Sequence, residues 1–248
     1  MDGAAALKQP LAIDLFCGLG GWTEGLLAEG YRVVGFDNHQ HVYGEAKYPA
    51  QLVIQDVLTI HGRQFKDAAL IVASPPCQAY SYRAMPWKRA KALPPPSNEL
   101  FEACFRIQRE ACEAAGRHIP LVVENVRGAQ KWVGRARWHF GSFYLWGDVP
   151  ALMPIARSSA KVGGISFSGY GEPGYKAQAF NGTAEQRLRN DIASAQDGCK
   201  QRGSGAAWWR GEVGSHGSKS SKRKAASAHI AKIPFVLSQH IARAWWPQ

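Results

Sequence analysis

Strand-like and helix-like segments alternate along most of this chain, and that alternation restricts the possible folds more than any other feature. Residues 11–16 read as a buried strand and run into a glycine-rich turn, which is followed by a helical stretch over residues 22–29. Further strands are expected at residues 32–36, 51–54, 70–73, 120–123 and, with its flanks, 135–146. Helices are expected at 41–48, from Ser97 as N-cap to about residue 116, and at 233–246. This order predicts an α/β fold with a parallel, doubly wound sheet.

Length and composition indicate a globular protein. The 248 residues, of which 46% are hydrophobic, can bury the core of one large domain with a small appendage. The chain lacks the run of about 20 apolar residues that a membrane span needs, and its N-terminus does not resemble a signal peptide. Its five cysteines include no CxxC pair, which argues against a disulfide framework and a zinc site. We therefore expect a cytoplasmic protein with no membrane partner and no metal.

The positive charge is concentrated in the second part of the chain. Residues 1–150 hold 16 Lys and Arg against 14 Asp and Glu, whereas residues 151–248 hold 14 against 5, within a total of +11. Such an excess favours a polyanionic partner, and nucleic acid is the natural one. Between residues 157 and 223 the sequence is rich in Gly, Ser, Lys and Arg with scattered aromatics such as Trp208 and Trp209. These aromatics suit base stacking, or the packing of a small local core.

Several chemically useful residues stand where the expected strands end. In a parallel sheet these ends share one edge, which is where open α/β folds bind ligands. The stretch from Asp14 to Gly21, together with Asp37 and Asp56, therefore predicts a nucleoside site. The glycine turn leads into a helix N-terminus that can bind a carboxylate or phosphate, and Asp37 can accept ribose hydroxyls. The absence of GxxxxGK[ST] excludes a phosphate-loop NTPase.

Cys77 is the candidate nucleophile. It lies in the segment SPPCQAYS, directly after the apolar strand that ends at Ala73, and Pro75 and Pro76 stiffen its loop. The alternative for Cys77 is a small buried residue, which is what most free cysteines are. Glu124 follows the strand at 120–123, so that a thiol and a carboxyl group would face one pocket.

A thiolate and a carboxyl group in one pocket suit covalent catalysis on an electron-poor ring. Attack by Cys77 on C6 of cytosine, with Glu124 bound to N3 and the exocyclic amine, would make C5 nucleophilic and able to take a methyl group. A nearby cation such as Arg135 or Arg137 would favour the thiolate. A cytosine in a duplex would have to be flipped out of the stack to reach the pocket.

The segments DLFCGLGG, FDN, QDV, SPPCQAYS, ENV and GRAR, in this order, resemble the DNA (cytosine-5)-methyltransferase family. The resemblance covers about residues 11–146. It implies a Rossmann-like methyltransferase sheet, S-adenosylmethionine as donor, Cys77 as nucleophile and Glu124 holding the cytosine, with Arg135 and Arg137 near both. It also implies a set of residues that bind the donor: Phe16, Gly18, Gly20, Asp37, Asn38, Asp56 and Val57. Further candidates for donor binding are Asp14, Pro76 and Lys232.

Three regions are expected: a catalytic, donor-binding domain over 1–156, a short basic target-recognition region over 157–226, and a C-terminal helix over 227–248 that returns to the catalytic domain. The sequence departs from the family pattern in two places. GRAR follows ENV sooner than is usual, and the C-terminal segment lacks the asparagine of the family's GNxVP motif, so that Ala231 or Lys232 takes its place. A lysine facing the donor would favour a donor with an extra carboxylate.

The resemblance implies that the partner is double-stranded DNA. We expect the protein to be a monomer that is associated with DNA in the cell. An RNA methyltransferase is the nearest alternative, because a transfer-RNA enzyme that resembles this family also carries PPCQ and ENV. A catalytically silent regulator of methylation is a second alternative, although Cys77 and Glu124 are both present. A dinucleotide oxidoreductase is disfavoured by the combination of PPCQ with ENV.

Overall fold

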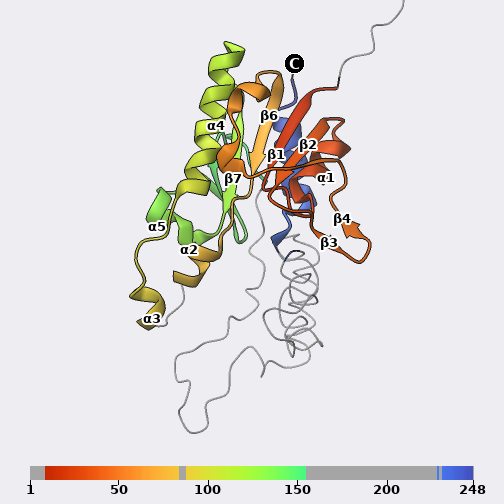
Figure 1. Ribbon diagram of the computed structural model, residues 1–248. Coiled ribbons are helices and arrows are strands. Elements are labelled where there is room, and N and C mark those ends of the chain that lie inside the picture. The colour runs from red at the N-terminus through yellow and green to blue at the C-terminus, as the bar shows by residue number, and fades with distance from the viewer. Residues whose placement is uncertain (1–8, 84–87, 155–227, 229–230, 248) are drawn as a thin grey trace, which may run out of the picture.

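A seven-stranded, mostly parallel sheet organises the protein. The computed structural model describes residues 9–83, 88–154, 228 and 231–247 (Figure 1). The strand order is β5-β2-β1-β6-β7-β9-β8, and β1 pairs in parallel with both β2 and β6. The strands are β1 (Leu11–Leu15), β2 (Arg32–Asp37), β5 (Gln51–Ile54), β6 (Ala68–Ala73), β7 (Leu121–Asn125), β8 (Trp138–Phe140) and β9 (Phe143–Gly147). The predicted doubly wound α/β sheet is confirmed, and the strand order reverses at β1.

One end of the sheet is antiparallel. Within the described residues, the antiparallel pairs of this sheet are β7 with β9 and β8 with β9. The sequence predicts one strand with its flanks over residues 135–146, and the structure instead forms a hairpin there. Gly141 lies between the two strands with φ 58, a left-handed conformation that glycine adopts without strain. The hairpin places Tyr144 beside Asn125, at the carboxyl end of β7.

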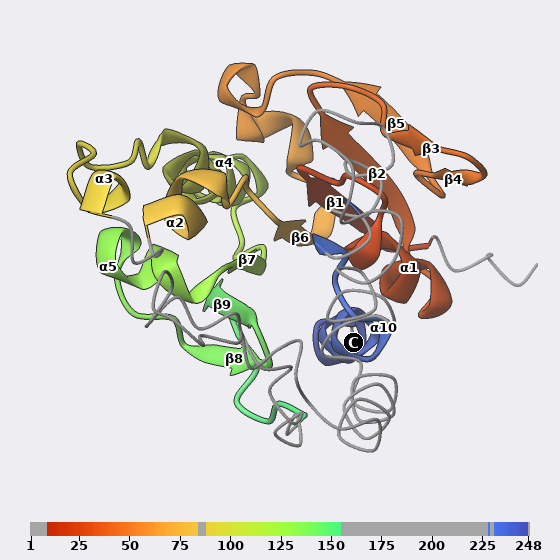
Figure 2. The same cartoon turned by 90° about the horizontal axis from the view of Figure 1, so that it is seen from below.

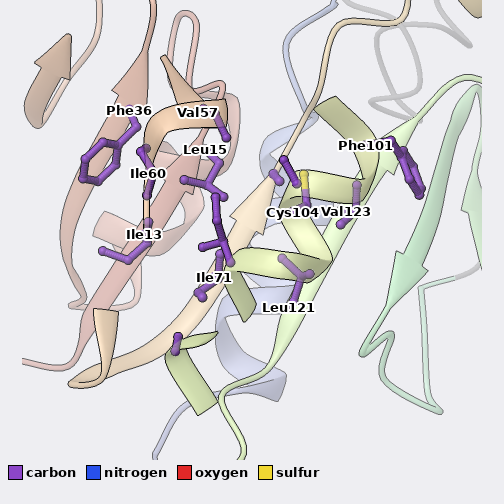
Figure 3. Packing of buried hydrophobic residues seen from close by; sticks show 14 of the residues in the cluster. Ile13, Leu15, Phe36, Val57, Ile60, Ile71, Phe101, Cys104, Leu121 and Val123 are labelled. Carbon is purple, nitrogen blue, oxygen red and sulfur yellow. The ribbon is translucent and has the colours of Figure 1, made fainter. Parts of the chain in front are cut away.

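Helices cover both faces of the sheet (Figures 1 and 2). One face is covered by α1 (Gly21–Ala28) and α10 (Phe235–Ala244), and the other by α4 (Glu99–Ala115) with the short 3-10 turns η1 (Val57–Thr59) and η2 (Gly62–Phe65). The α4 face is filled by aliphatic and aromatic side chains, of which Figure 3 shows Ile13, Leu15, Ile71, Leu121 and Cys104. Cys104 is fully buried there, as the apolar face of the predicted helix requires.

Helices α1 and α10 lie unusually close to each other. A Cβ added to Gly25 would lie 2.3 Å from the Gln239 nitrogen, so that only glycine fits at this crossing. Tyr31, just after α1, donates a hydrogen bond of 3.0 Å to the Ala242 carbonyl. The expected return of the C-terminal helix to the sheet is therefore observed for α10.

The predicted helix over residues 41–48 is wrong. Residues Val42–Tyr43 and Ala46–Lys47 form a small antiparallel hairpin, β3 and β4, around Gly44, whose φ is 63. A glycine at positive φ suits a hairpin turn, and Val and Tyr favour extended backbone. After the hairpin, the Tyr48 ring packs against the backbone of β2, where a Cβ on Gly35 would meet it at 2.3 Å.

The segment between β6 and α4 contains two short helices, α2 (Gln78–Arg83) and α3 (Lys88–Lys91), where the sequence predicts a long loop. The N-cap of helix α4 is Asn98 rather than the predicted Ser97, although Ser97 Oγ accepts a hydrogen bond from the Glu99 amide at 3.3 Å. The predicted target-recognition region, residues 157–226, lies outside the described residues. No helix in the described part of the chain has the length and apolar character needed to cross a membrane.

Candidate active site

The Cys77 loop is fixed by backbone contacts at the carboxyl edge of the sheet, the edge that faces the viewer in Figure 2. The Ser74 amide donates to the Leu15 carbonyl at 3.1 Å, which ties the start of the loop to the end of β1. The buried Asn125 side chain donates to the Pro75 carbonyl at 2.9 Å, which ties the loop to the end of β7. These two bonds bring the SPPC and ENV segments together.

Glu124 is a buried carboxyl group on β7, with 8% of its surface exposed. Burial raises its pKa to about 8, because the carboxylate loses its hydration, and a hydrogen bond from Ser74 lowers the pKa in part. Glu124 is therefore mostly protonated at neutral pH. Ser74 in turn accepts a hydrogen bond of 3.0 Å from the indole Nε1 of Trp22, which lies in the first turn of α1.

Cys77 is half-buried at the start of α2, where its carbonyl accepts hydrogen bonds from the Tyr80 and Ser81 amides. Burial raises the pKa of the Cys77 thiol, a hydrogen bond with the Ser81 side chain lowers it, and the charge of Glu124 raises it again. The hydrogen bond from Asn125 to the Pro75 carbonyl brings the loop of Cys77 to the end of β7, the strand that carries Glu124. The thiol and the carboxyl group that the sequence singles out therefore share one site.

Arg135 and Arg137 are both exposed, in the segment that leads into β8. The Arg137 amide donates to the Leu145 carbonyl at 2.8 Å and so begins the hairpin. The main influences on the Cys77 pKa are burial, Ser81 and Glu124, with no arginine among them. In the described arrangement Ser81, rather than an arginine, is the group that favours the thiolate.

The glycine turn after β1 has the backbone geometry of a ligand-binding turn. Phe16 has φ 59, Gly18 φ 50 and Gly20 φ 78, so that three residues in five adopt left-handed conformations. A Cβ on Gly20 would also meet the Pro49 ring at 2.5 Å. The Gly18 amide donates to Asp37 Oδ2 at 2.9 Å, which joins the turn to the end of β2. The N-cap residue of α1 is Gly20, which has no side chain to cap the helix.

Asp37 is held in place by several neighbours. Its Oδ1 accepts a hydrogen bond from the Asn38 amide at 2.8 Å and lies 3.6 Å from His41 Nε2. His39 lies next to the same oxygen, and the three side chains offer ligand atoms within 4.8 Å of one another. Only 8% of the surface of Asp37 is exposed. With Phe16 and Gly18, it forms the part of the predicted nucleoside site that the structure brings together.

Asp14 does not reach the rim where the sequence places it, because it lies inside β1 with 1% of its surface exposed. Its Oδ2 accepts a hydrogen bond of 2.6 Å from Thr23, and the Thr23 oxygen lies 2.7 Å from the Tyr48 hydroxyl. Since Thr23 has a single hydroxyl hydrogen, Tyr48 donates to Thr23. Burial raises the pKa of Asp14 to about 7. Asp14 therefore ties β1 to the first turn of α1 through Thr23.

The other candidate donor-site residues have mixed positions. Asp56 is exposed, and its Oδ1 accepts from the Leu58 amide at 2.9 Å, capping η1. Val57 is 2% exposed and packs in the core under α4. Asn38 and Pro76 are exposed.

Lys232 lies beside the first turn of α1 and forms an ion pair with Glu24. A Cβ on Gly21 would lie 2.4 Å from the Ile233 nitrogen and 2.9 Å from Lys232 Cγ, so the segment before α10 closes directly over this turn. The segment therefore occupies the place that the sequence assigns to the end of the donor site. Because Glu24 neutralises the Lys232 charge, the structure gives no support to a donor with an extra carboxylate.

The arrangement fits an S-adenosyl donor: a turn at positive φ, an uncapped helix start and a buried carboxylate on the next strand meet at one edge. Sequence reasoning missed the supporting side chains Ser74, Trp22, Ser81 and Thr23. Ser74 and Ser81 frame the quoted SPPCQAYS segment, which was the available signal. Trp22 and Thr23 carry no such signal, because each contacts residues far along the chain.

Residues 11–132 match the family model described as C-5 cytosine-specific DNA methylase. Similar solved structures are a DNA modification methyltransferase encoded within an E. coli prophage (23% identity, TM-score 0.37), the S. pombe methyltransferase Dnmt2 (17%, 0.34) and the Entamoeba histolytica methyltransferase EhMeth (18%, 0.33). Each match covers 50% of this chain, and 34%, 36% and 40% of the respective proteins. This chain therefore spans little more than a third of their length. None of the curated proteins matches it.

Proposed function

We propose, from the match of residues 11–132 to the C-5 cytosine-specific DNA methylase family, that the protein transfers a methyl group from S-adenosylmethionine to C5 of cytosine in DNA. The observation that carries the proposal is the pairing of Cys77 with a neutral, buried Glu124 at the carboxyl edge of the sheet. A nucleophile and an acid within reach of each other are what addition to a pyrimidine ring requires.

In the proposed reaction, the Cys77 thiolate adds to C6 of the cytosine while Glu124 gives its proton to N3. A bond forms between sulfur and C6, the electrons of the C5–C6 double bond make C5 nucleophilic, and Glu124 becomes a carboxylate. After C5 has been methylated, the C5 proton is lost to a water molecule, the double bond re-forms as Cys77 leaves as thiolate, and N3 returns its proton to the Glu124 carboxylate. Burial of Glu124 supports this role, because it keeps the group protonated at neutral pH.

Bound S-adenosylmethionine would supply the methyl group as an electrophile. Phe16, Gly18 and Asp37 would hold it, with Asp37 accepting hydrogen bonds from the ribose hydroxyls and the first amides of α1 donating to its carboxylate. Asn38, Asp56 and Pro76 are exposed near these strand ends and remain candidates for contact with the donor. The segment around Lys232 would close the site over the start of α1.

DNA is the proposed substrate because the family match names DNA and because the charge of +11 suits a polyanion. The target base would be flipped into the site, since C5 and C6 lie inside the stack of a duplex. In the proposed complex the exposed Arg135 and Arg137 would contact the flipped base or its phosphates. An RNA substrate is the alternative that the experiment has to separate.

The test is to incubate the protein with S-adenosylmethionine and either duplex DNA or transfer RNA, and to analyse the nucleosides by mass spectrometry. We expect 5-methyldeoxycytidine from DNA with the wild type and none with Cys77→Ala. Cys112→Ala is the matched control, because this half-buried thiol lies on α4, outside the candidate site, and should retain activity. Product in RNA alone would overturn the DNA assignment, and an active Cys77→Ala variant would overturn the proposed mechanism.

A further inference from the structure

Two imidazoles and a carboxyl group meet just after β2 ends, at the edge of the sheet that the candidate donor site also uses. Asp37 Oδ1 lies 3.6 Å from His41 Nε2 and 4.0 Å from His39 Nδ1. The ligand atoms of the three side chains lie within 4.8 Å of one another, and the two imidazole centroids are 4.0 Å apart. In the described part of the chain, this is the one group of three such side chains that comes so close together.

Asp37 is already fixed in one orientation. Its Oδ1 accepts a hydrogen bond from the Asn38 amide at 2.8 Å, and its Oδ2 accepts one from the Gly18 amide at 2.9 Å. Hydrogen bonds of this kind orient a carboxyl group as a metal ligand, because they hold it in place before the ion arrives. Each oxygen has two lone pairs, so Oδ1 keeps one for a further partner on the side of the histidines.

The two histidines can supply nitrogen ligands with small movements. His41 is half-buried, and its Nε2 is the nitrogen closer to Asp37. His39 is exposed, and its Nδ1 lies 2.5 Å from Asn38 Oδ1. A neutral imidazole can carry its hydrogen on either nitrogen, so moving it to Nε2 frees Nδ1 for a metal ion. Ligands about 2.1 Å from a tetrahedral ion lie about 3.4 Å apart, so the two rings have to approach by up to about 1.5 Å.

We propose that Asp37, His39 and His41 bind a divalent transition-metal ion such as Zn²⁺, with the fourth coordination position left to water. Imidazole nitrogens suit Zn²⁺, Co²⁺ and Ni²⁺, whereas Mg²⁺ and Ca²⁺ take oxygen ligands. The cysteine spacing of the sequence does not predict this site, because its ligands are two imidazoles and a carboxylate.

A metal ion at this position would compete with the donor, and this part of the inference rests on the proposed function. In the proposed complex the ribose hydroxyls of S-adenosylmethionine donate to Asp37. The ion would take the lone pair that the Asn38 amide leaves on Oδ1, so that the hydroxyls would find one free acceptor position, on Oδ2, in place of two. By linkage, donor and ion should weaken each other's binding by the same factor, which we expect to be about tenfold.

The first experiment is a titration of the chelator-treated protein with Co²⁺ in the absence of DNA and donor, followed by its visible absorption. We expect the bands of a bound four-coordinate ion, which Zn²⁺ should displace. His39→Ala and His41→Ala should each weaken Co²⁺ binding by about tenfold or more. His118→Ala is the matched control, because His118 is also exposed and its Nε2 lies 3.2 Å from a single carboxylate, that of Asp148. Unchanged Co²⁺ binding in the two variants, or none in the wild type, would overturn the site.

The second experiment is a calorimetric titration with S-adenosylmethionine, with and without saturating Zn²⁺. We expect Zn²⁺ to lower the donor affinity of the wild type about tenfold and to have little effect on that of His41→Ala. Equal donor affinity in the two wild-type titrations would overturn the competition. A wild type that binds no donor even without Zn²⁺ would contradict the proposed function instead. The Co²⁺ titration contains no donor, so it decides the metal site in either case.

Discussion

At the scale of single residues, Asp14 shows how a carboxyl group is kept in the middle of a sheet. It lies on β1, a central strand whose two faces are both covered, and it is 1% exposed. Its Oδ2 is hydrogen-bonded to Thr23, and among the described residues its buried Oδ1 finds no partner. A buried carboxylate with one oxygen unpaired is unfavourable, so the neutral acid is preferred.

The raised pKa of Asp14 predicts a loss of stability with rising pH. The ordinary pKa of an aspartate is 3.8 and that of Asp14 in the folded protein is about 7, so between these values the folded state holds a proton that the unfolded state has released. The free energy of unfolding should therefore fall as pH rises from about 4 to 7. Asp14→Asn should flatten this part of the curve. Urea unfolding between about pH 4.5 and 8 measures it, with Glu124→Gln as a reference for the second buried acid.

An unchanged slope in Asp14→Asn would show that Asp14 is ionised in the folded protein.

Single residues also show which parts of the site can be predicted from the sequence. Cys77 and Glu124 can be predicted because each follows a recognisable apolar strand, and both stand at the predicted sheet edge. The burial of Asp14 cannot be predicted in the same way, since it depends on Thr23 and Tyr48 reaching it from other elements.

At the scale of elements, the contact of α1 with α10 sets the geometry of the donor turn. Gly25 lies against the Ser238 hydroxyl and the Gln239 nitrogen. A Cβ added to Gly25 would be 2.3 Å from each of these atoms. One turn earlier, Gly21 faces Ile233 and Lys232 in the same way. Two glycines on one face of α1 therefore let the C-terminal segment approach the helix start. Any change in this separation would move the ion pair between Lys232 and Glu24.

Gly25→Ala should overpack this crossing. We expect a loss of stability of about 1–3 kcal/mol, because the new methyl group meets backbone atoms that cannot turn away. Donor affinity should fall as well, since the segment over Gly21 would be displaced. Denaturant unfolding and calorimetric titration with S-adenosylmethionine measure the two effects. Gly44→Ala, at a position with open space around it, is the control for backbone strain alone. Unchanged stability in Gly25→Ala would contradict the close crossing.

Elements with strong local signals are predictable, and those fixed by distant contacts are less so. The strands at residues 32–36 and 51–54 and helix α4 follow from apolar pattern and caps, and the structure contains all three. The predicted helix over 41–48 fails because Gly44 turns the chain and Tyr48 is held by Gly35 and Thr23. The hairpin over 138–147 escapes prediction because its pairing with β7 is not visible in the local sequence.

At the scale of the whole molecule, positive charge and chemistry are separated along the chain. The residues of the candidate site lie between Asp14 and Arg137, with Lys232 the exception, whereas the excess of positive charge lies after residue 150. We infer a division of labour in which the first part performs the reaction and the second supplies most of the attraction to DNA phosphates.

Replacing Lys222, Arg223 and Lys224 by glutamine should weaken DNA binding and make it less sensitive to salt. These residues lie outside the described part of the chain, so the prediction rests on charge alone. Each lost phosphate contact should reduce the slope of log K against log salt by about 0.9. Fluorescence anisotropy at several salt concentrations measures the slope. Arg63→Gln with Lys66→Gln, close before the start of β6 and away from the carboxyl edge, is the control. An unchanged slope would show that the three residues do not contact phosphate.

The position of α10 also affects how the chain acquires its fold during synthesis. Tyr31 and its hydrogen-bond partner Ala242 are 211 positions apart, and among the described residues it is α10 that covers the apolar face of α1. A nascent chain emerging from the ribosome can therefore pair β1, β2 and β6 early, before α10 is available to pack on Leu26 and Trp22. Chaperone demand should accordingly persist until α10 has left the exit tunnel and can cover this face.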